Sequence, residues 1–161
     1  MNKVHKAAVL ISWGLLAAVF IHLCFKWSSM PETTGVHFDS SGEFDVFASK
    51  KYIAYPFVIG VVFLLLLHLA ALAVRKARIG LKINSEGETV LRERLMLLID
   101  ANRLFISLWA AYWTELVIYQ HRLIELPVMI GLMILFVMFF DICRLAFSLR
   151  KKYPPDSENI E

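Results

Sequence analysis

The sequence predicts an all-α integral membrane protein, a four-helix bundle with an extracytoplasmic loop between its first two helices. Of the 161 residues, 58% are hydrophobic and 19% are charged, and the mean hydropathy is +0.61. Soluble domains are about 45–50% apolar and about 25% charged. The apolar residues also fall in four blocks, and Lys and Arg concentrate between certain blocks. These observations exclude a disordered chain, a coiled coil and a nucleic-acid-binding module.

Four blocks are each expected to cross the membrane as one helix: residues 7–25, 53–74, 98–119 and 127–147. About 20 apolar residues span a bilayer, and a helix satisfies its own backbone hydrogen bonds in lipid. The third block is uninterrupted only over 104–119, and its extension to a full span includes Asp100 and Arg103. We therefore expect one four-span domain over 1–152 and a flexible cytoplasmic tail over 153–161.

The third helix is expected to begin before its membrane span. Ser85 and Glu88 match a capping box with Ser85 as the N-cap, and a helix from there could run to Tyr119. A β-turn at Glu86-Gly87 is the competing interpretation of the same residues.

The basic residues predict the orientation. Segment 75–103 contains seven Lys and Arg residues, and the tail follows Arg150, Lys151 and Lys152. The first connection contains three Lys residues against four Asp and Glu residues. Because Lys and Arg collect in cytoplasmic loops, both termini are expected in the cytoplasm and the first and third connections outside. The lipid bilayer is then the first partner of the chain.

The outer connection, residues 31–50, is dense in groups that bind ligands. His37, Asp39, Glu43 and Asp45 lie within nine residues, and Ser40-Ser41-Gly42 between them is typical of a turn. Such a turn would fold the first two residues back toward the last two. Carboxylates suit Ca²⁺ or Mg²⁺ and imidazole suits Zn²⁺, so these four are candidate ligands of a divalent cation. Their spacing does not fit an EF-hand.

Two other interpretations of this loop remain open. In a structural loop, Asp39 and Asp45 would cap turns and Lys50 would pair with a carboxylate. His37 and Phe47 would then pack on the rim of the bundle. The third interpretation is a docking surface for another protein.

A pattern of the type P-x-x-[IV]-P-x-H-[FW]-N-x-x-G-x-x-D-x-[WF]-G-x-K is matched here by Pro31, His37, Phe38, Gly42, Asp45, Phe47 and Lys50. Thr34, Gly35, Asp39 and Ala48 depart from it. With this pattern the segment resembles a bacterial membrane domain of unknown function, shared with Sdp-type toxin-immunity and signalling proteins. The resemblance implies a bacterial plasma membrane location and a sensing or immunity role. A peptide toxin or another membrane protein would then be the partner.

Ionisable residues at membrane depth form a second group of candidates, because they are costly in lipid and face a protein interior or a cavity. His22 and Glu115 fall near the predicted outer surface. Near the inner surface fall His68, Asp100, Arg103, Asp141 and Arg144. Asp141 should need a partner at its depth, and Arg103 or Arg144 could serve. The two groups either form a proton or ion path or make separate interhelical contacts.

Enzyme signatures are absent from the sequence, which has no nucleophile elbow, Walker loop, His-Glu-x-x-His or CxxC. We expect a non-enzymatic sensor or immunity-type protein, with no cofactor beyond the possible cation. Its acidic outer loop, 31–50, would bind an extracellular peptide, toxin or cation, and its basic inner loop would contact a partner. A small transporter or accessory subunit that uses Glu115 and Asp141 is the alternative. A membrane-bound enzyme with Glu115, His121 and His37 as an acid–base group is the third.

Overall fold

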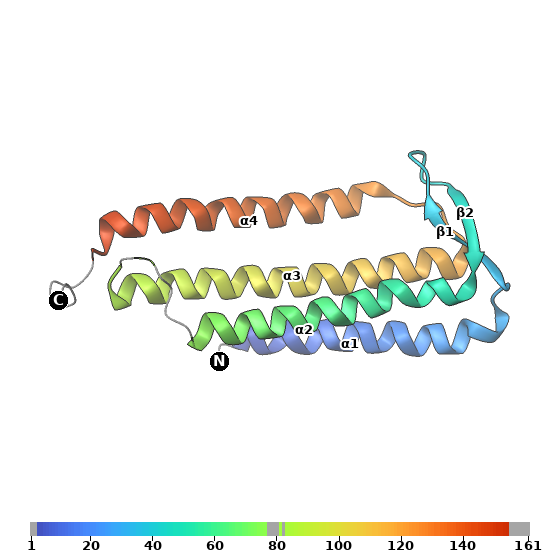
Figure 1. Ribbon diagram of the computed structural model, residues 1–161, viewed down its shortest axis with the longest axis horizontal. Coiled ribbons are helices and arrows are strands. Elements are labelled where there is room, and N and C mark those ends of the chain that lie inside the picture. Colours follow the sequence, from blue (N-terminus) through green and yellow to red (C-terminus); the bar gives the residue numbers. More distant parts are fainter. Residues whose placement is uncertain (1–2, 77–80, 82, 155–161) are drawn as a thin grey trace.

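The computed structural model describes residues 3–76, 81 and 83–154. In this part of the chain it shows an all-α four-helix bundle with a β-hairpin at one end (Figure 1). The predicted fold class is therefore confirmed. The elements in chain order are α1 (Lys3–Lys26), β1 (Thr33–Phe38), β2 (Phe44–Ser49), α2 (Ala54–Lys76), α3 (Ser85–Tyr119) and α4 (Glu125–Lys152). Short 3₁₀ turns at Trp27–Ser29 and Lys50–Ile53 connect the antiparallel hairpin to α1 and α2.

Each of these four helices is long and apolar enough to cross a membrane. Even α2, with 23 residues, extends about 35 Å at 1.5 Å per residue, against about 30 Å of hydrocarbon. Large apolar side chains are exposed along the bundle, including Leu10 at 75%, Phe136 at 69% and Phe147 at 74%. Apolar surface on this scale is stable against lipid and not against water. The chain is a multi-pass membrane protein.

The long third helix is confirmed, and the alternative β-turn at Glu86-Gly87 is wrong because both residues are helical. The predicted N-cap was one residue too late. Asn84 is the cap, and its side-chain oxygen accepts a hydrogen bond from the Gly87 N–H at 3.0 Å. Asn caps as well as Ser, so the chain enters the helix one position earlier. Glu88 does not close a capping box; it pairs with Arg92, one turn further on, at 2.6 Å.

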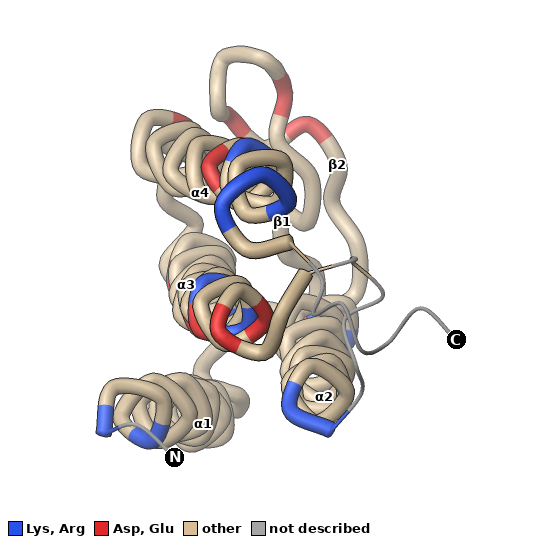
Figure 2. The backbone as a smooth tube through the Cα atoms, turned by 90° about the vertical axis from the view of Figure 1, so that its left-hand side faces the viewer, with Lys and Arg blue, Asp and Glu red and all other residues tan. Residues whose placement is uncertain are grey.

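Helix α3 is the central element, because α1, α2 and α4 each pack against it. Seen from the end, α4 lies on one side of α3, and α1 and α2 lie on the other (Figure 2). Three buried clusters follow one another along α3, formed by Leu91 with Ile142 and Leu149, by Ala110 with Leu16 and Leu64, and by Val117 and Ile118 with Leu23, Met30 and Ile53.

Both termini lie at the end of the bundle opposite the hairpin (Figure 1). We call the two ends the hairpin end and the termini end. Lys and Arg residues gather at the termini end (Figure 2). Tyr153, which we expected in a flexible tail, lies against Gly87 at this end, and its carbonyl accepts a hydrogen bond from the Asn84 N–H. The remaining tail residues, 155–161, lie outside the described part of the chain.

Small residues let three helices approach closely at the middle of the bundle. A Cβ atom on Gly60 of α2 would lie 3.3 Å from the Ala110 Cβ atom of α3 and 3.4 Å from Leu16 Cδ2 of α1. Gly14 of α1 is the opposite case, since a Cβ atom there would meet nothing within 4 Å. One glycine is therefore required by packing and the other faces open space.

The substitution Gly60→Val should lower the free energy of unfolding by about 1–3 kcal/mol, because the added methyl groups have no room. The matched substitution Gly14→Val should change it by less than about 0.5 kcal/mol. Thermal unfolding of both variants in detergent checks this. Equal losses at the two positions would contradict the helix arrangement.

Candidate functional site

The predicted turn joins β1 to β2 and is closed by Asp39. Its Oδ1 atom accepts hydrogen bonds from the Ser41 N–H at 2.8 Å, the Ser41 hydroxyl at 2.6 Å and the Glu43 N–H at 3.0 Å. Gly42 has a φ of 83°, in the left-handed region that glycine adopts without strain. These hydrogen bonds, that from the Ser41 hydroxyl foremost, lower the pKa of Asp39 below its ordinary value of 3.8.

The other polar residues of the hairpin form two separate pairs. His37 Nδ1 lies 2.6 Å from Asp45 Oδ1, so the turn does bring these residues together. Lys50 Nζ lies 2.8 Å from Glu32 Oε1, which confirms the predicted pairing of Lys50 with a carboxylate. The expectation that His37 and Phe47 pack on the rim of the bundle is wrong, because both side chains are mostly exposed.

The four candidate cation ligands do not converge. Asp39 binds its own turn, His37 binds Asp45, and Glu43 lies 3.6 Å from Arg122. Among the described residues, no group of three or more His, Cys, Asp or Glu side chains is arranged to hold a metal ion. The divalent cation at the outer loop stays a prediction that this geometry does not support.

The hairpin is attached firmly to the bundle through β1. The Phe38 ring packs edge-on against Trp113 of α3, with 5.1 Å between the ring centroids. The Gly35 N–H donates to Gln120 Oε1 at 3.0 Å, and the Leu123 N–H donates to the Gly42 carbonyl at 2.9 Å. Strand β1 therefore rests on α3, and the turn after it rests on the connection to α4.

Strand β2 is exposed by contrast. In β1, Thr34 and Phe38 are buried, at 1% and 8% exposure. In β2, Val46 and Phe47 are 48% and 59% exposed. The sheet has two strands, so β2 forms one of its edges. The hairpin presents an edge strand with exposed apolar side chains and the neighbouring Asp45 carboxylate.

A polar cluster connects α1 and α3 below the hairpin. His22 Nδ1 lies 2.6 Å from Glu115 Oε1, and Tyr119, which we did not predict, places its hydroxyl 3.3 Å from His22 Nε2. We call these three residues the hairpin-end cluster. Both ring nitrogens of His22 thus have partners within the protein. His121 does not join an acid–base group with Glu115, since its ring lies against Tyr119.

A second cluster is buried near the termini end and joins three helices. His5 Nδ1 lies 2.7 Å from Asp100 Oδ1, and Arg103 Nη1 lies 2.8 Å from the same oxygen. Arg103 Nη2 also donates to the Leu67 carbonyl of α2 at 3.1 Å. The three side chains of this termini-end cluster are at most 8% exposed.

Sequence reasoning missed His5, although a signal was present. The buried residues of α1 recur at intervals of three and four positions, and His5 is the first of them: His5, Ala8, Ser12, Leu16, Val19 and Leu23. This stripe is the face that α1 turns toward α3, so His5 belongs to the buried face and not to the polar N-terminus.

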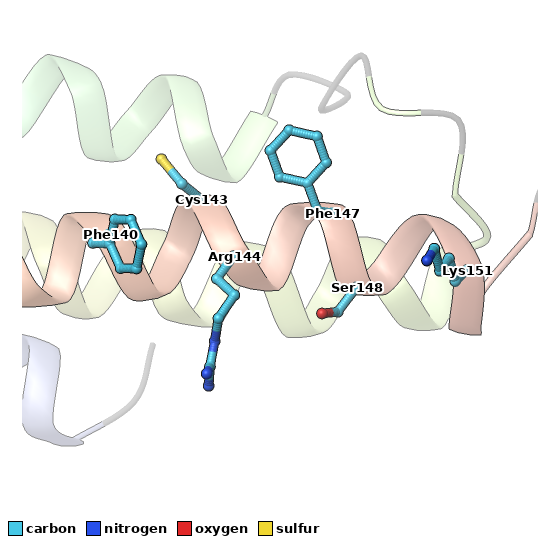
Figure 3. A pocket seen from close by; sticks show the side chains of 6 residues that line it. All are labelled: Phe140, Cys143, Arg144, Phe147, Ser148 and Lys151. Atoms are coloured by element: carbon cyan, nitrogen blue, oxygen red, sulfur yellow. The ribbon is translucent and has the colours of Figure 1, made fainter.

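The remaining predicted residues lie outside both clusters. Asp141 pairs with Arg144 at 3.9 Å and not with Arg103. The side chains of Asp141 and Arg144 are well exposed on α4. His68 is exposed on α2. A shallow groove of about 370 Å³ also lies on α4, but this one helix supplies all six residues that line it (Figure 3). These residues do not assemble into an enclosed site.

The layer between the two clusters is closely packed. Leu16, Leu64 and Ala110 are at most 1% exposed. The hydroxyls of Ser107 and Thr114 donate to carbonyls of their own helix, at 2.9 and 2.7 Å. Leu16, Leu64 and Ala110 lie between the two clusters, and each cluster makes its own contacts between α1 and α3.

The depressed pKa of Asp39 gives a pH prediction. The hydrogen bonds to the ionised Asp39 carboxylate stabilise the folded hairpin. This stabilisation is fully present above pH 3.8, the ordinary pKa of the unfolded chain, and is lost as the pH falls through the lower pKa of the folded state. Ser41→Ala should raise this pKa toward 3.8 because a donor is removed, and Ser40→Ala should leave it unchanged. NMR titration of the Asp39 carboxyl carbon in micelles measures both. An unchanged midpoint in Ser41→Ala would contradict the hydrogen-bonded turn.

No family model, curated protein or solved structure matches the chain. The resemblance of residues 31–50 to the bacterial membrane domain therefore stays a prediction. The function is inferred from the hairpin, from the hairpin-end cluster and from the termini-end cluster.

Proposed function

We propose that the protein is a non-enzymatic membrane sensor or immunity-type protein whose hairpin binds an extended, positively charged peptide. The observation that supports this most directly is the edge of β2, with Val46 and Phe47 exposed beside Asp45. An extended peptide can add a strand to such an edge through main-chain hydrogen bonds, and exposed side chains then select its sequence. An edge strand presents unpaired backbone groups on which another chain can pair, and Val46 and Phe47 leave β2 exposed.

The charge of the hairpin selects the class of peptide. Residues 31–50 contain four Asp and Glu residues against one Lys. Opposite charges steer association and suppress wrong partners, so a basic peptide is favoured over an acidic one. Because β1 is held on α3, the peptide meets a preformed edge and little order has to be created on binding.

The predicted orientation of the protein in a bacterial plasma membrane supports recognition of an extracellular peptide. Lys and Arg gather at the termini end, which the positive-inside rule assigns to the cytoplasm (Figure 2). The hairpin end then faces the outside. The resemblance of residues 31–50 to a domain of toxin-immunity and signalling proteins agrees with this role.

The structure offers less support to the alternatives. Transport through Glu115 and Asp141 needs both residues on one path, but Glu115 pairs with His22 of α1, whereas Asp141 is nearly half exposed on α4 and pairs with Arg144. A hydrolase needs a substrate cavity beside its base, and His22 lines neither the groove on α4 nor the cavity between α1, α2 and α3 at the termini end. We therefore place recognition at the hairpin and not catalysis or transport in the bundle.

The test is peptide binding to the protein in nanodiscs, with a library of unstructured peptides of graded net charge. Basic peptides should bind, and the substitution Phe47→Asp should abolish detectable binding because it removes the apolar contact. Asp45→Asn should weaken binding about fivefold, as expected for one rim charge worth about 1 kcal/mol. N-methylation of alternate residues of a bound peptide should also remove binding, because it blocks the main-chain hydrogen bonds.

A control variant and a survival assay complete the test. Ile124→Asp, at an exposed site in the connection between α3 and α4, should bind peptides like the wild type. Bacteria that express the wild type should survive a bound membrane-active peptide better than bacteria that express Phe47→Asp. Equal binding of acidic and basic peptides, or indifference to N-methylation, would refute recognition at the β2 edge.

A further inference from the structure

A cavity of about 550 Å³ lies at the termini end, far from the hairpin. Three helices line it, with Val4 and His5 from α1, Arg75 from α2, and Arg92, Glu93, Arg94, Met96, Leu97 and Asp100 from α3. Its volume is within the range of about 300–1,000 Å³ typical of small-ligand sites. Unlike the groove on α4, it lies between helices.

The lining of this cavity has an excess of positive charge. Arg75, Arg92 and Arg94 line it together with the acidic Glu93 and Asp100, and Arg92 is itself paired with Glu88, so Arg75 and Arg94 against Glu93 leave the positive excess. Asp100, on the wall, is paired with Arg103 of the termini-end cluster. The cavity is therefore suited to an anion.

The arginine positions are partly fixed before any ligand arrives. Arg92 pairs with Glu88 at 2.6 Å and also donates to the carbonyl of Val74 in α2. This contact holds the end of α2, and with it Arg75, beside α3. An arginine held in place loses less conformational entropy on binding than a mobile one.

The depth of the cavity matches that of lipid phosphates. We take Tyr119, an aromatic residue at the hairpin end of α3, as the outer boundary of the hydrocarbon. At 1.5 Å per residue, about 30 Å of hydrocarbon then ends near residue 99 of α3. Arg94 lies about 8 Å further along the axis, and the headgroup region is roughly that thick. Arg75 is one residue from the end of α2. The arginines thus stand at headgroup level, and Met96 and Leu97 stand next to the hydrocarbon.

We propose that this cavity binds the phosphate group of an anionic lipid headgroup. The planar guanidinium matches phosphate oxygens with two parallel hydrogen bonds. Basic pockets between spanning helices are a recognised way to hold such headgroups. The apolar side chains of Val4, Met96 and Leu97 would contact the start of the acyl chains. This site is independent of peptide binding at the hairpin, because it is at the other end of the bundle.

The experiment is a titration of the detergent-purified protein with short-chain phosphatidylglycerol, phosphatidylcholine or inorganic phosphate, followed by the melting temperature. Phosphatidylglycerol should raise the melting temperature in a saturable manner, and phosphatidylcholine should not. The double variant Arg75→Gln/Arg94→Gln should bind the anionic lipid more weakly, by about fivefold for each arginine. The melting temperature of each variant without lipid verifies that it is folded.

The matched control is Lys3→Gln/Arg150→Gln, which removes two exposed basic residues at the same end but outside the cavity. It should keep the wild-type affinity. Equal loss in both double variants would mean general attraction to a basic surface and would overturn the proposal. So would the absence of a saturable shift with every probe. A shift with inorganic phosphate alone, lost in Arg75→Gln/Arg94→Gln, would assign the cavity to free phosphate instead of lipid.

Discussion

The buried ion cluster of His5, Asp100 and Arg103 is the constraint on which the arrangement of the helices depends. An ionised group left unpaired at low dielectric is strongly unfavourable, so Asp100 needs partners wherever it is buried. Its partners come from α1 and from its own helix, and Arg103 is in turn held by a carbonyl of α2. A slip of α3 by one turn, about 5.4 Å, would break the contacts to His5 of α1 and to the Leu67 carbonyl of α2, and would leave Asp100 and Arg103 buried with only each other. There is no hydrophobic driving force between helices in lipid, because lipid is as apolar as the helix surfaces, so polar contacts and close packing at small residues such as Gly60 set the axial positions.

Once the axial positions are fixed, the two ends of the bundle acquire different chemistry. At one end, α3 and its connection to α4 hold β1, which leaves the acidic and apolar edge of β2 exposed. At the other end, the same helix extends beyond the hydrocarbon and brings its arginines beside the end of α2. The layer in between, with Leu16, Leu64 and Ala110, separates these ends instead of connecting them. In our proposal, the bundle holds two binding sites apart, one at each end, and does not form a pathway between them.

The sequence predicts the helices well because long apolar blocks leave few alternatives in lipid. It also predicts the turn at Ser40-Ser41-Gly42, since short polar residues and glycine have strong local preferences. It does not predict the strands, because six-residue segments beside a turn are equally consistent with a loop. The central position of α3 and the pairing of Asp100 with His5 both depend on which helices pack against each other. No local sequence pattern determines that. His5 was overlooked because it lies among lysines at a predicted polar terminus.

The most direct test is a double-mutant cycle on His5→Ala and Asp100→Asn, with the free energy of unfolding measured in mixed micelles with a denaturing detergent. If the buried pair positions α1 on α3, the two substitutions should be coupled by about 1–3 kcal/mol. The exposed pair His37→Ala and Asp45→Asn supplies the reference and should show a coupling below about 1 kcal/mol. Additive effects of His5→Ala and Asp100→Asn would contradict the central role of this cluster.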